Sequence, residues 1–422
     1  MKPEIKQRIE QLNNGKIPKG YKKTDFGVFP CDWVTDETLG DLFDFYGGLS
    51  KSRDELGEEG YAYLHYGDLH RGTFNTVSID HYEQLPKCDI SLTGKEKCLM
   101  KDGDVAFLDA SEDLEGTSRA VLIDNPENKP FIAGLHIIYG KSKNNSLDKW
   151  FKQYITSSES VKKQFQRLAV GFKVYGVNRD TIPRIKVAFP SSNKEQSRIA
   201  EILMKWDEAI ELYDKQIDAL TRYKAVCLRK MFPAKDQNVP EWRFRGFSGD
   251  WKQRKLGEFC DITTGKLDAN AMVEDGKYDF YTSGITKYKI NTAAFSGPAI
   301  TIAGNGATVG YMHIADGLFN AYQRTYVLSN FIADRQYLFY AIGVKLPGKI
   351  AQEARTGNIP YIVMNMLTDL EIYVTAKAEQ KRIGEYLGKL DNLITFYQRK
   401  KEAIINQRKI LQQYLLNGIV RV

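Results

Sequence analysis

Three short motifs approach the patterns of nucleotide-binding and nuclease sites without completing them. Residues 134–142 (Gly-x5-Gly-Lys-Ser) and residues 304–310 (Gly-x-Gly-x3-Gly) each have one residue too many between glycines for a phosphate loop or a dinucleotide fingerprint. Asp113 with Glu127-x-Lys129 imitates a nuclease carboxylate pattern, but Glu127 lies in a turn over residues 124–128, so we take the match as chance. The chain also lacks Asn-Pro-Pro-Tyr, Asp-Pro-Pro-Tyr and His-Glu-x-x-His. We therefore predict no catalytic residues in this chain.

The cysteines and histidines give no metal site either. The five cysteines are odd in number, scattered, and never spaced as Cys-x-x-Cys, and the five histidines are dispersed. This pattern predicts free thiols in a reducing compartment. No window approaches 18 consecutive apolar residues, and the first ten residues are charged. We therefore expect a cytoplasmic protein with no membrane span and no signal peptide.

The charges are distributed unevenly along a chain long enough for two domains. The 422 residues carry a net charge of +7, and 42% of them are hydrophobic. Residues 32–129 hold 22 acidic and 9 basic side chains, whereas residues 141–186 hold 11 basic and 3 acidic ones. The basic stretch is either a solvated face or a phosphate-binding surface, and the second reading is favoured by its interleaved Phe165, Phe172, Tyr175 and Asn178.

An internal repeat organises the whole chain. Residues 195–213 and 379–397 match without a gap at ten of nineteen positions, and both segments begin Glu-Gln-x-Arg-Ile. A second repeated motif precedes each of these segments, because residues 29–40 and 247–257 share a Trp followed by Leu-Gly. The order is thus a globular segment and a helix, repeated once. The chain is a tandem duplication.

Both repeated segments begin long helices. Apolar residues recur at spacings of four and three over five heptads in each helix, which predicts a coiled-coil seam. Lys224 and Arg408 break the two seams at the same heptad position, either by snorkelling or as selectors of register. Gly384 and Gly388 weaken the second helix and allow a close approach. The predicted seam is Ile199, Leu203, Trp206, Ile210, Tyr213, Ile217, Leu220, Ile383, Leu387, Leu390, Ile394, Tyr397, Ile404 and Leu411.

The globular segments read as α+β, with more strand than helix. We predict an exposed basic helix over residues 149–168 and a shorter counterpart over residues 334–344. The predicted strands are residues 61–66, 105–108, 120–123, 137–139 and 185–189 in the first segment, and 278–282, 299–303, 326–328 and 370–374 in the second. The two helices are expected to pair antiparallel within the chain, with pseudo-twofold symmetry and a globular segment at each end.

This organisation resembles the specificity subunits of type I restriction–modification systems. The likeness covers nearly the whole chain and rests on residues 33–40 with 195–199, and on residues 251–257 with 379–383. It implies that each globular segment is a target recognition domain reading one half of a split, asymmetric sequence in double-stranded DNA. It also implies that the helices act as a ruler and dock two methyltransferase subunits. The methyltransferase subunits would bind S-adenosylmethionine, and this chain would bind no cofactor. Restriction/translocase subunits would join the complex.

Candidate DNA contacts are polar residues near turns that we expect to be exposed, because arginine suits guanine and asparagine or glutamine suits adenine. Each of them could instead form a turn or carry a surface charge. In the first segment the candidates are Arg53, His65, His70, Arg71, Ser118, Arg119, Lys173, Tyr175 and Asn178. In the second they are Ser283, Lys287, Lys289, Asn305, Gln323, Arg324, Arg355 and Asn358.

The repeat also predicts the domain boundaries. They are an N-terminal helix (1–14), a first recognition domain (15–190), a central helix (191–232), a linker (233–246), a second recognition domain (247–375), and a C-terminal helix and tail (376–422). Two other classes of protein stay open at this point. One is a coiled-coil scaffold with protein-binding globular domains, which the basic stretch disfavours, and the other is a self-contained methyltransferase or nuclease, which the missing motifs disfavour.

Overall fold

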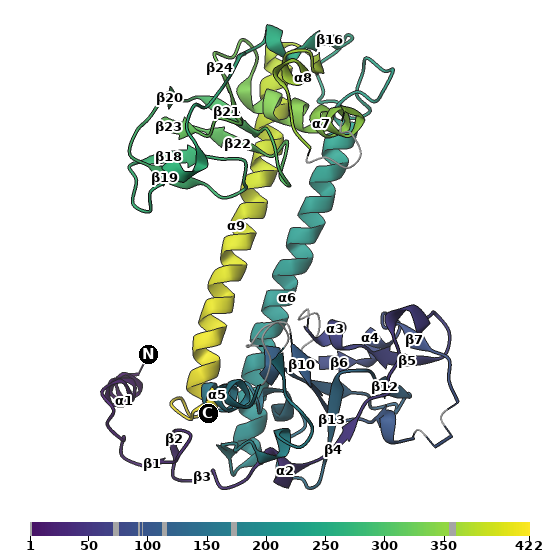
Figure 1. Ribbon diagram of the computed structural model, residues 1–422, viewed down its shortest axis with the longest axis vertical. Helices are drawn as coiled ribbons and strands as arrows, with labels where there is room; N and C mark the ends of the chain where they lie inside the picture. The colour runs from purple at the N-terminus through teal and green to yellow at the C-terminus, as the bar shows by residue number, and fades with distance from the viewer. Residues whose placement is uncertain are drawn as a thin grey trace. The chain divides into compact units, whose positions relative to one another are not determined.

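The computed structural model of the chain describes residues 2–70, 76–91, 93–94, 96–111, 116–169, 175–353 and 360–422. These residues form two compact units, each of which includes part of both long helices. Unit 1 is Met1–Glu211 with Glu402–Val422, and unit 2 is Leu212–Lys401. Helices α6 (Asn193–Lys230) and α9 (Lys377–Leu416) are the longest in the described part of the chain (Figure 1). Both begin within two residues of the repeated Glu-Gln, as the sequence predicts.

Unit 1 contains a five-stranded sheet and a four-stranded sheet. The larger has the order β4 (Phe43–Gly47), β13 (Ile137–Ser142), β9 (Val105–Leu108), β11 (Ala120–Asp124) and β6 (Thr76–Ser78). The smaller has the order β7 (Lys87–Cys88), β5 (Tyr61–Leu64), β12 (Phe131–Ala133) and β8 (Leu99–Met100). Within the smaller sheet β5 and β12 are parallel, whereas β7 and β8 run antiparallel to their neighbours.

Unit 2 repeats this strand order. Its sheets have the orders β17 (Asp261–Thr264), β24 (Thr325–Ser329), β21 (Ala299–Ala303), β22 (Met312–Ala315), and β19 (Tyr288–Ile290), β18 (Tyr278–Tyr281), β23 (Leu318–Ala321), β20 (Phe295–Ser296). The pair β18 and β23 is parallel, as β5 and β12 are in unit 1. The duplication seen in the helices therefore extends through both sheets, although β6 has no equivalent in the described part of unit 2. Few residues of the strands match, among them Phe131 with Phe319 and Ala133 with Ala321.

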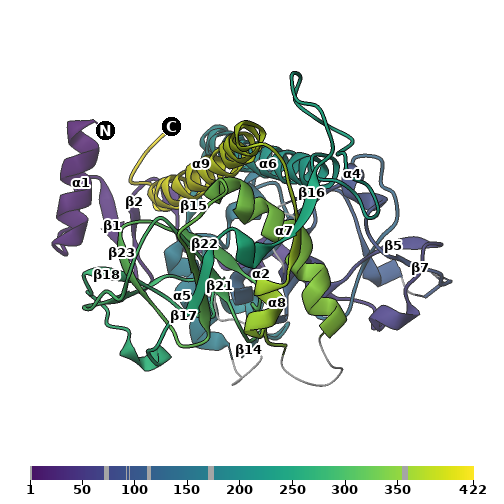
Figure 2. The same ribbon diagram turned by 90° about the horizontal axis from the view of Figure 1, so that it is seen from above.

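A short antiparallel pair joins the start and end of each globular part. In unit 1, β3 (Trp33–Val34) pairs with β15 (Phe189–Pro190), and in unit 2, β16 (Lys252–Lys255) pairs with β25 (Glu371–Val374). Helix α7 (Arg335–Glu353) packs on β21, β22 and β25, and α8 (Met364–Thr368) packs on β17 (Figure 2). The strand-rich α+β architecture is the one that the sequence predicts.

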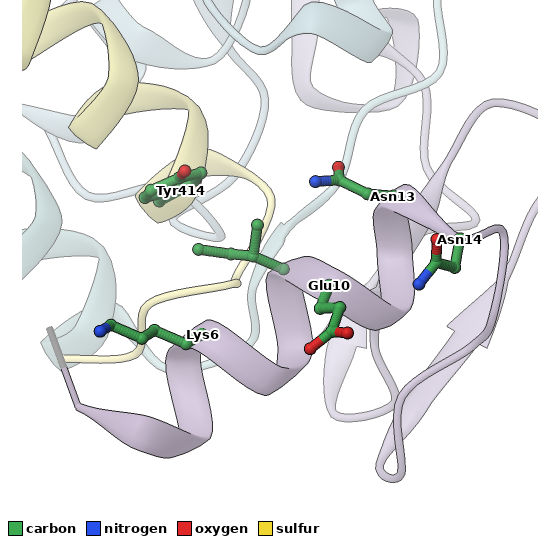
Figure 3. A pocket seen from close by; sticks show the side chains of 6 residues that line it. Lys6, Glu10, Asn13, Asn14 and Tyr414 are labelled. Atoms are coloured by element: carbon green, nitrogen blue, oxygen red, sulfur yellow. The ribbon is translucent and has the colours of Figure 1, made fainter.

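The N-terminal segment of unit 1 lies beside the end of α9. Helix α1 (Pro3–Asn13) is followed by the hairpin β1 (Tyr21–Lys23) and β2 (Val28–Pro30). The Tyr21 hydroxyl donates to the Gly418 carbonyl at 2.5 Å, and Arg8 donates to the Ile419 carbonyl. Figure 3 shows the open groove of about 550 Å³ between α1 and Tyr414 of α9. Its only charged lining residues are Lys6 and Glu10, so the groove carries no net charge.

The duplicated residues join each long helix to its globular part. The Gln196 side chain accepts the N–H of Asp148 at 2.7 Å, and the equivalent Gln380 accepts the N–H of Asp334 at 3.0 Å. The preceding glutamate of each repeat is held by an arginine from the segment that follows the other helix. Arg421 binds Glu195 and Asp32, and Arg243 binds Glu379 through two nitrogens at 2.7 and 2.8 Å. The repeated Glu-Gln is thus a structural fastening.

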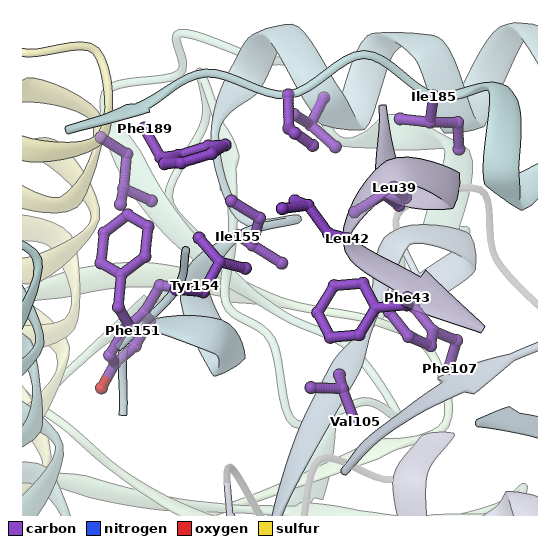
Figure 4. Close-up of a cluster of buried hydrophobic side chains, with 14 of the residues drawn as sticks. Leu39, Leu42, Phe43, Val105, Phe107, Phe151, Tyr154, Ile155, Ile185 and Phe189 are labelled. Atoms are coloured by element: carbon purple, nitrogen blue, oxygen red, sulfur yellow. The ribbon is translucent and has the colours of Figure 1, made fainter. Parts of the chain in front are cut away.

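Each unit has an aromatic core that includes its helix segments. In unit 1, Phe43, Phe107, Phe151 and Phe189 belong to one buried cluster (Figure 4). The same cluster includes Ile199 of α6. In unit 2, Trp251, Tyr337 and Phe232 pack with Ile383 and Leu387 of α9. Each fully buried side chain of this size contributes about 1.5–3 kcal/mol. The start of α6 is therefore part of the core of unit 1 and the start of α9 part of the core of unit 2, because each presents an apolar face to its globular part.

Three predicted elements differ from the structure. Residues 149–168 are not one exposed helix, because Phe151–Tyr154 form a buried 3₁₀ turn and α5 (Glu159–Leu168) begins only after the cap Ser158. The predicted strand 185–189 is reduced to β15 (Phe189–Pro190), with a 3₁₀ turn over Ile182–Arg184 before it and one isolated bridge between Lys186 and Thr38. Helix α7 extends to Glu353, beyond the predicted 344, through Pro347. The other eight predicted strands are present.

The close approach predicted at Gly384 is made by α7 of the same unit. A methyl group on Gly384 would lie 2.9 Å from both Asp334 Oδ1 and Tyr337 N. We expect Gly384→Ala to lower the free energy of unfolding by about 1–3 kcal/mol, as overpacking does. The control Gly348→Ala lies in α7 with open space around it and should raise stability by up to about 1 kcal/mol. Denaturant unfolding measures both, and equal effects of the two variants would contradict the packing.

Candidate nucleic-acid interface

Four loops of unit 2 meet at one edge of its two sheets. We name residues 282–287, 304–311, 322–324 and 360–363 the second loop cluster. The Gly304 N–H donates to the Arg324 carbonyl at 2.8 Å, and the Gly304 carbonyl accepts the N–H of Ile362 at 2.8 Å. The Ser283 hydroxyl donates to Asn305 Oδ1 at 2.6 Å, which ties in the loop after β18. The strand order thus brings together segments that lie far apart in the sequence.

Unit 1 has the same arrangement of backbone hydrogen bonds. We name residues 65–70, 109–111, 134–136 and 175–178 the first loop cluster. The Asp109 N–H donates to the His136 carbonyl at 3.1 Å, and the Asp109 carbonyl accepts the N–H of Val177 at 2.8 Å. These bonds correspond one for one to those of Gly304 in unit 2. Each unit therefore carries one loop cluster built in the same way.

The second loop cluster presents aromatic and polar side chains to solvent. Tyr361 is 60% exposed, and Gln323 and Arg324 are exposed at the turn between β23 and β24. Among the described residues, the Arg324 guanidinium has no hydrogen-bond partner, so its donors can bind a ligand. Lys287 lies with Nζ 5.3 Å from the centre of the Tyr281 ring. Cations, amides and aromatic rings are the groups that contact bases and phosphates.

The first loop cluster has a different set of side chains. His136 at the equivalent turn places Nδ1 2.9 Å from Asp109 Oδ1, and its ring meets the edge of Tyr66 at 5.5 Å between centroids. Both the imidazole and the phenol can hydrogen-bond base edges. Because the scaffold is shared and the side chains differ, the two clusters are suited to different ligand surfaces.

Part of the basic stretch is neutralised inside unit 1. Lys149 binds Asp102 at 2.8 Å and Asp124 at 2.6 Å, which belong to the acidic stretch. Lys152 is buried and donates to the Gly103 carbonyl at 3.1 Å, and burial lowers the pKa of its ammonium group. The phosphate-binding reading of the stretch is therefore wrong for Lys149 and Lys152. Lys163 and Arg167 of α5 stay exposed and line a groove of about 290 Å³.

The described residues contain no group of three or more His, Cys, Asp or Glu placed to hold a metal ion. All five cysteines are free, as predicted, and burial raises the pKa of the Cys260 thiol to about 12. That thiol is protonated at neutral pH and is a poor nucleophile. Across the ranges described above, no helix is long and apolar enough to cross a membrane.

Comparison with known proteins identifies the family. The model of the type I restriction modification DNA specificity domain matches the chain twice, over residues 30–222 and 248–406. The chain belongs to this family. Each match includes one set of sheets and one loop cluster, so the structural repeat is a repeat of the specificity domain.

Relatives of known name agree with this assignment. The chain is 36% identical over 165 residues to the type I restriction enzyme EcoDI specificity subunit of Escherichia coli, in a match that covers 39% of this chain and 36% of that subunit. It is 21% identical to the putative MjaX specificity subunit of Methanocaldococcus jannaschii, over 96% of this chain and 97% of the relative. The crystal structure of the type I S subunit from M. genitalium has a TM-score of 0.63 at 18% identity, covering 91% of this chain and 96% of that one. That likeness shows a shared fold.

In this specificity-domain protein, several predicted DNA contacts of unit 2 come together. Ser283, Asn305, Gln323 and Arg324 all lie in the second loop cluster, and Lys287 closes the loop that contains Ser283. Lys289 lies outside it, in β19, where it binds Asp279 at 2.8 Å. Arg355 and Asn358 lie outside the described residues.

The predicted contacts of unit 1 are more scattered. His65 and Ser118 are buried, so the expectation that they face solvent is wrong, and the His65 ring accepts the Gly67 N–H at 3.1 Å. Burial lowers the pKa of the Arg119 guanidinium, which is half-buried. Arg53 places a terminal guanidinium nitrogen 3.7 Å from Asp68 Oδ1, and the Asn178 side chain accepts the N–H groups of Asp180 and Thr181. Tyr175 is in β14 (Tyr175–Gly176), and the backbone of His70 ends α3 (Tyr66–His70). Arg71 and Lys173 lie outside the described residues.

Sequence reasoning missed other residues of the loop clusters. Tyr66 and His136 in unit 1, and Tyr311 and Tyr361 in unit 2, are the most evident of them. His136 occupies the same position as Arg324, at the turn after the strand that pairs in parallel. The two turns follow Phe131-x-Ala133 and Phe319-x-Ala321 at the same spacing, but a match of two residues is too short to indicate the equivalence without the strand pairing.

Proposed function

We propose that this chain is the DNA-binding specificity subunit of a type I restriction–modification complex. Each unit reads one half of a split, asymmetric target in double-stranded DNA through its own loop cluster. The observation that carries this proposal is that the DNA specificity domain matches the chain twice. Each match covers one of the two sets of sheets, which have equivalent strand connections. The different side chains at equivalent positions favour different half-targets.

The proposal includes an antiparallel coiled coil of α6 and α9. In unit 1, Arg408 of α9 binds Asp207 of α6 with Nε 2.6 Å from Oδ1. In unit 2, Lys224 of α6 binds Asp391 of α9, and the rings of Tyr213 and Tyr397 lie 6.0 Å apart. Residues later in α6 contact residues earlier in α9, as an antiparallel pair requires. The residues of the predicted seam are all buried or half-buried, which supports this pairing.

The helix pair would set the gap between the half-targets and dock two methyltransferase subunits. Restriction/translocase subunits would join that core in a complete system. S-adenosylmethionine would bind in the methyltransferase partners, so that all chemistry lies outside this chain. The proposed recognition domains are residues 15–190 and 247–375, whose ends are tied by the β3–β15 and β16–β25 pairs.

The division of labour can be tested with the purified chain. Alone, it should transfer no labelled methyl group from S-adenosylmethionine to DNA and should not cut DNA. Together with its methyltransferase partner it should methylate one split sequence, and its binding should weaken with salt as phosphate contacts are screened. Methyl transfer by the chain alone would refute the proposal, as would salt-independent binding.

Arg324 offers a test of the second loop cluster. Arg324→Ala removes free donors at the turn and should reduce discrimination at one base of the second half-target by roughly 1–3 kcal/mol. The first half-target should stay unchanged. Lys289→Ala is the matched control, because this cation is exposed in the same unit but is bound to Asp279. Methylation rates on single-base variants of the target measure both substitutions, and equal losses at every base would show that Arg324 reads no base.

A further inference from the structure

A tyrosine, a carboxylate and a cation join three elements of unit 1. Tyr154 lies in the 3₁₀ turn Phe151–Tyr154, Asp207 in α6 and Arg408 in α9. The Tyr154 hydroxyl donates to Asp207 Oδ2 at 3.0 Å. Arg408 binds the same carboxylate through Nε at 2.6 Å and a terminal nitrogen at 2.9 Å. Its guanidinium carbon lies 5.9 Å from the centre of the Tyr154 ring.

The same triad occurs in unit 2. The Tyr340 hydroxyl of α7 donates to Asp391 Oδ2 of α9 at 2.6 Å, and Lys224 of α6 binds the other oxygen of that carboxylate. The Lys224 ammonium lies 5.5 Å from the centre of the Tyr340 ring. Asp391 is the repeat equivalent of Asp207, and Lys224 that of Arg408. The two long helices thus exchange roles, each supplying the carboxylate in one unit and the cation in the other.

This geometry explains why the seam is broken twice at the same position. Arg408 and Asp207 are 18% and 17% exposed, so the cation does not snorkel to water but is paired with the carboxylate over the tyrosine ring. Burial, and then the neighbouring carboxylate, raise the pKa of the Tyr154 phenol, and burial does the same for Tyr340. Both phenols therefore stay protonated at neutral pH and donate to a charged acceptor. Hydrogen bonds to a charged acceptor are about twice as strong as neutral ones, and the bond of Tyr340 at 2.6 Å is shorter than that of Tyr154 at 3.0 Å.

Each tyrosine also stands on the segment that leads to a loop cluster. The turn with Tyr154 is followed by α5 and then by residues 175–178 of the first loop cluster. Helix α7 with Tyr340 precedes residues 360–363 of the second. The triads thus join the helix pair by polar contacts to the segment that supplies one of the four loops of each cluster.

We propose that the two triads are positioning devices that fix the orientation of each loop cluster on the helix pair and so restrict the gap length that the protein accepts. A reader that can tilt would meet its half-target at neighbouring spacings, whereas a fastened one would not. The residues touch no base, so the letters of each half-target do not depend on them. This inference rests on the proposed function as a reader of split targets.

The test uses the full chain in complex with its methyltransferase partner. Tyr154→Phe and Tyr340→Phe remove only the hydroxyl and keep the ring under the cation. Sequencing of methylated sites should show unchanged letters in both halves. Methylation at gaps one base pair shorter or longer should rise roughly tenfold relative to the wild-type gap, and further in the double variant, since a hydrogen bond to a charged group restrains by about that factor.

Asp214→Asn is the matched control, because Asp214 pairs with Lys401 between the same two helices and involves no tyrosine. It should leave the gap distribution unchanged. Lys224→Arg, which copies the cation of unit 1, should also keep the wild-type gap. An unchanged gap distribution in the double tyrosine variant would overturn the inference, even if its thermal stability fell. Methylation by the wild-type complex without any split target would instead overturn the proposed function.

Discussion

Replacing residues 247–375 with the corresponding segment of a relative should change one half of the recognised sequence and leave the other half intact. The two ends of this segment flank the antiparallel pair of β16 and β25, in which Lys252 lies opposite Val374. A transplanted segment therefore enters and leaves the fold at neighbouring points. The effect should be complete, because loss of a correct half-target removes most of the specific binding energy.

The reciprocal replacement is the control for this exchange. Residues 15–190 should change only the other half, since β3 and β15 close that segment in the same way. Sequencing of methylated sites in both chimaeras reports the outcome. If either exchange altered both halves, the two units would not be independent readers.

A second large effect is expected from lengthening the helix pair. The midpoint between the two ion pairs lies at residues 215–216 of α6 and 399–400 of α9, because Asp207 pairs with Arg408 and Lys224 with Asp391. One heptad inserted after Lys215 and one after Arg399 would keep the seam in phase. Each helix would grow by about 10 Å, the length of about three base pairs. The recognised letters should stay the same while the preferred gap lengthens.

Binding by this variant should also weaken, because about three added base pairs turn the second half-target by roughly 100° about the duplex axis. A four-residue insertion at the same points is the control, since it interrupts the heptad phase and locally unwinds the seam, and it should weaken assembly with the methyltransferase more than the heptad insertion does. Methylated sites with the original gap at full activity, or with altered letters, would show that the helices do not set the spacing.

The helices and the duplication could be predicted from the sequence because their determinants are local or repeated. The seam spacing from Ile199 to Leu220 is visible within one segment, and Glu195 and Glu379 are kept because each binds an arginine from a distant segment. The strand order could not be predicted. Equivalent strands such as β5 and β18 share a position in the sheet but only one residue, Tyr61 with Tyr278, so only pairing over long range reveals them.

The loop clusters show the same limit. Arg324 and Gln323 were identified by residue type, and their position at an exposed turn follows from local sequence. The burial of His65 was not predicted, because it results from packing at the end of β5, and the importance of His136 was hidden for the same reason. The pairing of Lys149 with Asp102 and Asp124 likewise joins residues that are 25 or more positions apart. Charge counts along the sequence cannot distinguish such internal pairs from an open basic surface.

The most direct test of the central claim is to sequence the DNA sites that the wild-type chain and its methyltransferase partner methylate together. The account predicts one asymmetric target, made of two short specified parts separated by a gap of constant length and unspecified sequence. A single uninterrupted target, two unrelated targets used separately, or methylation without sequence preference would contradict it.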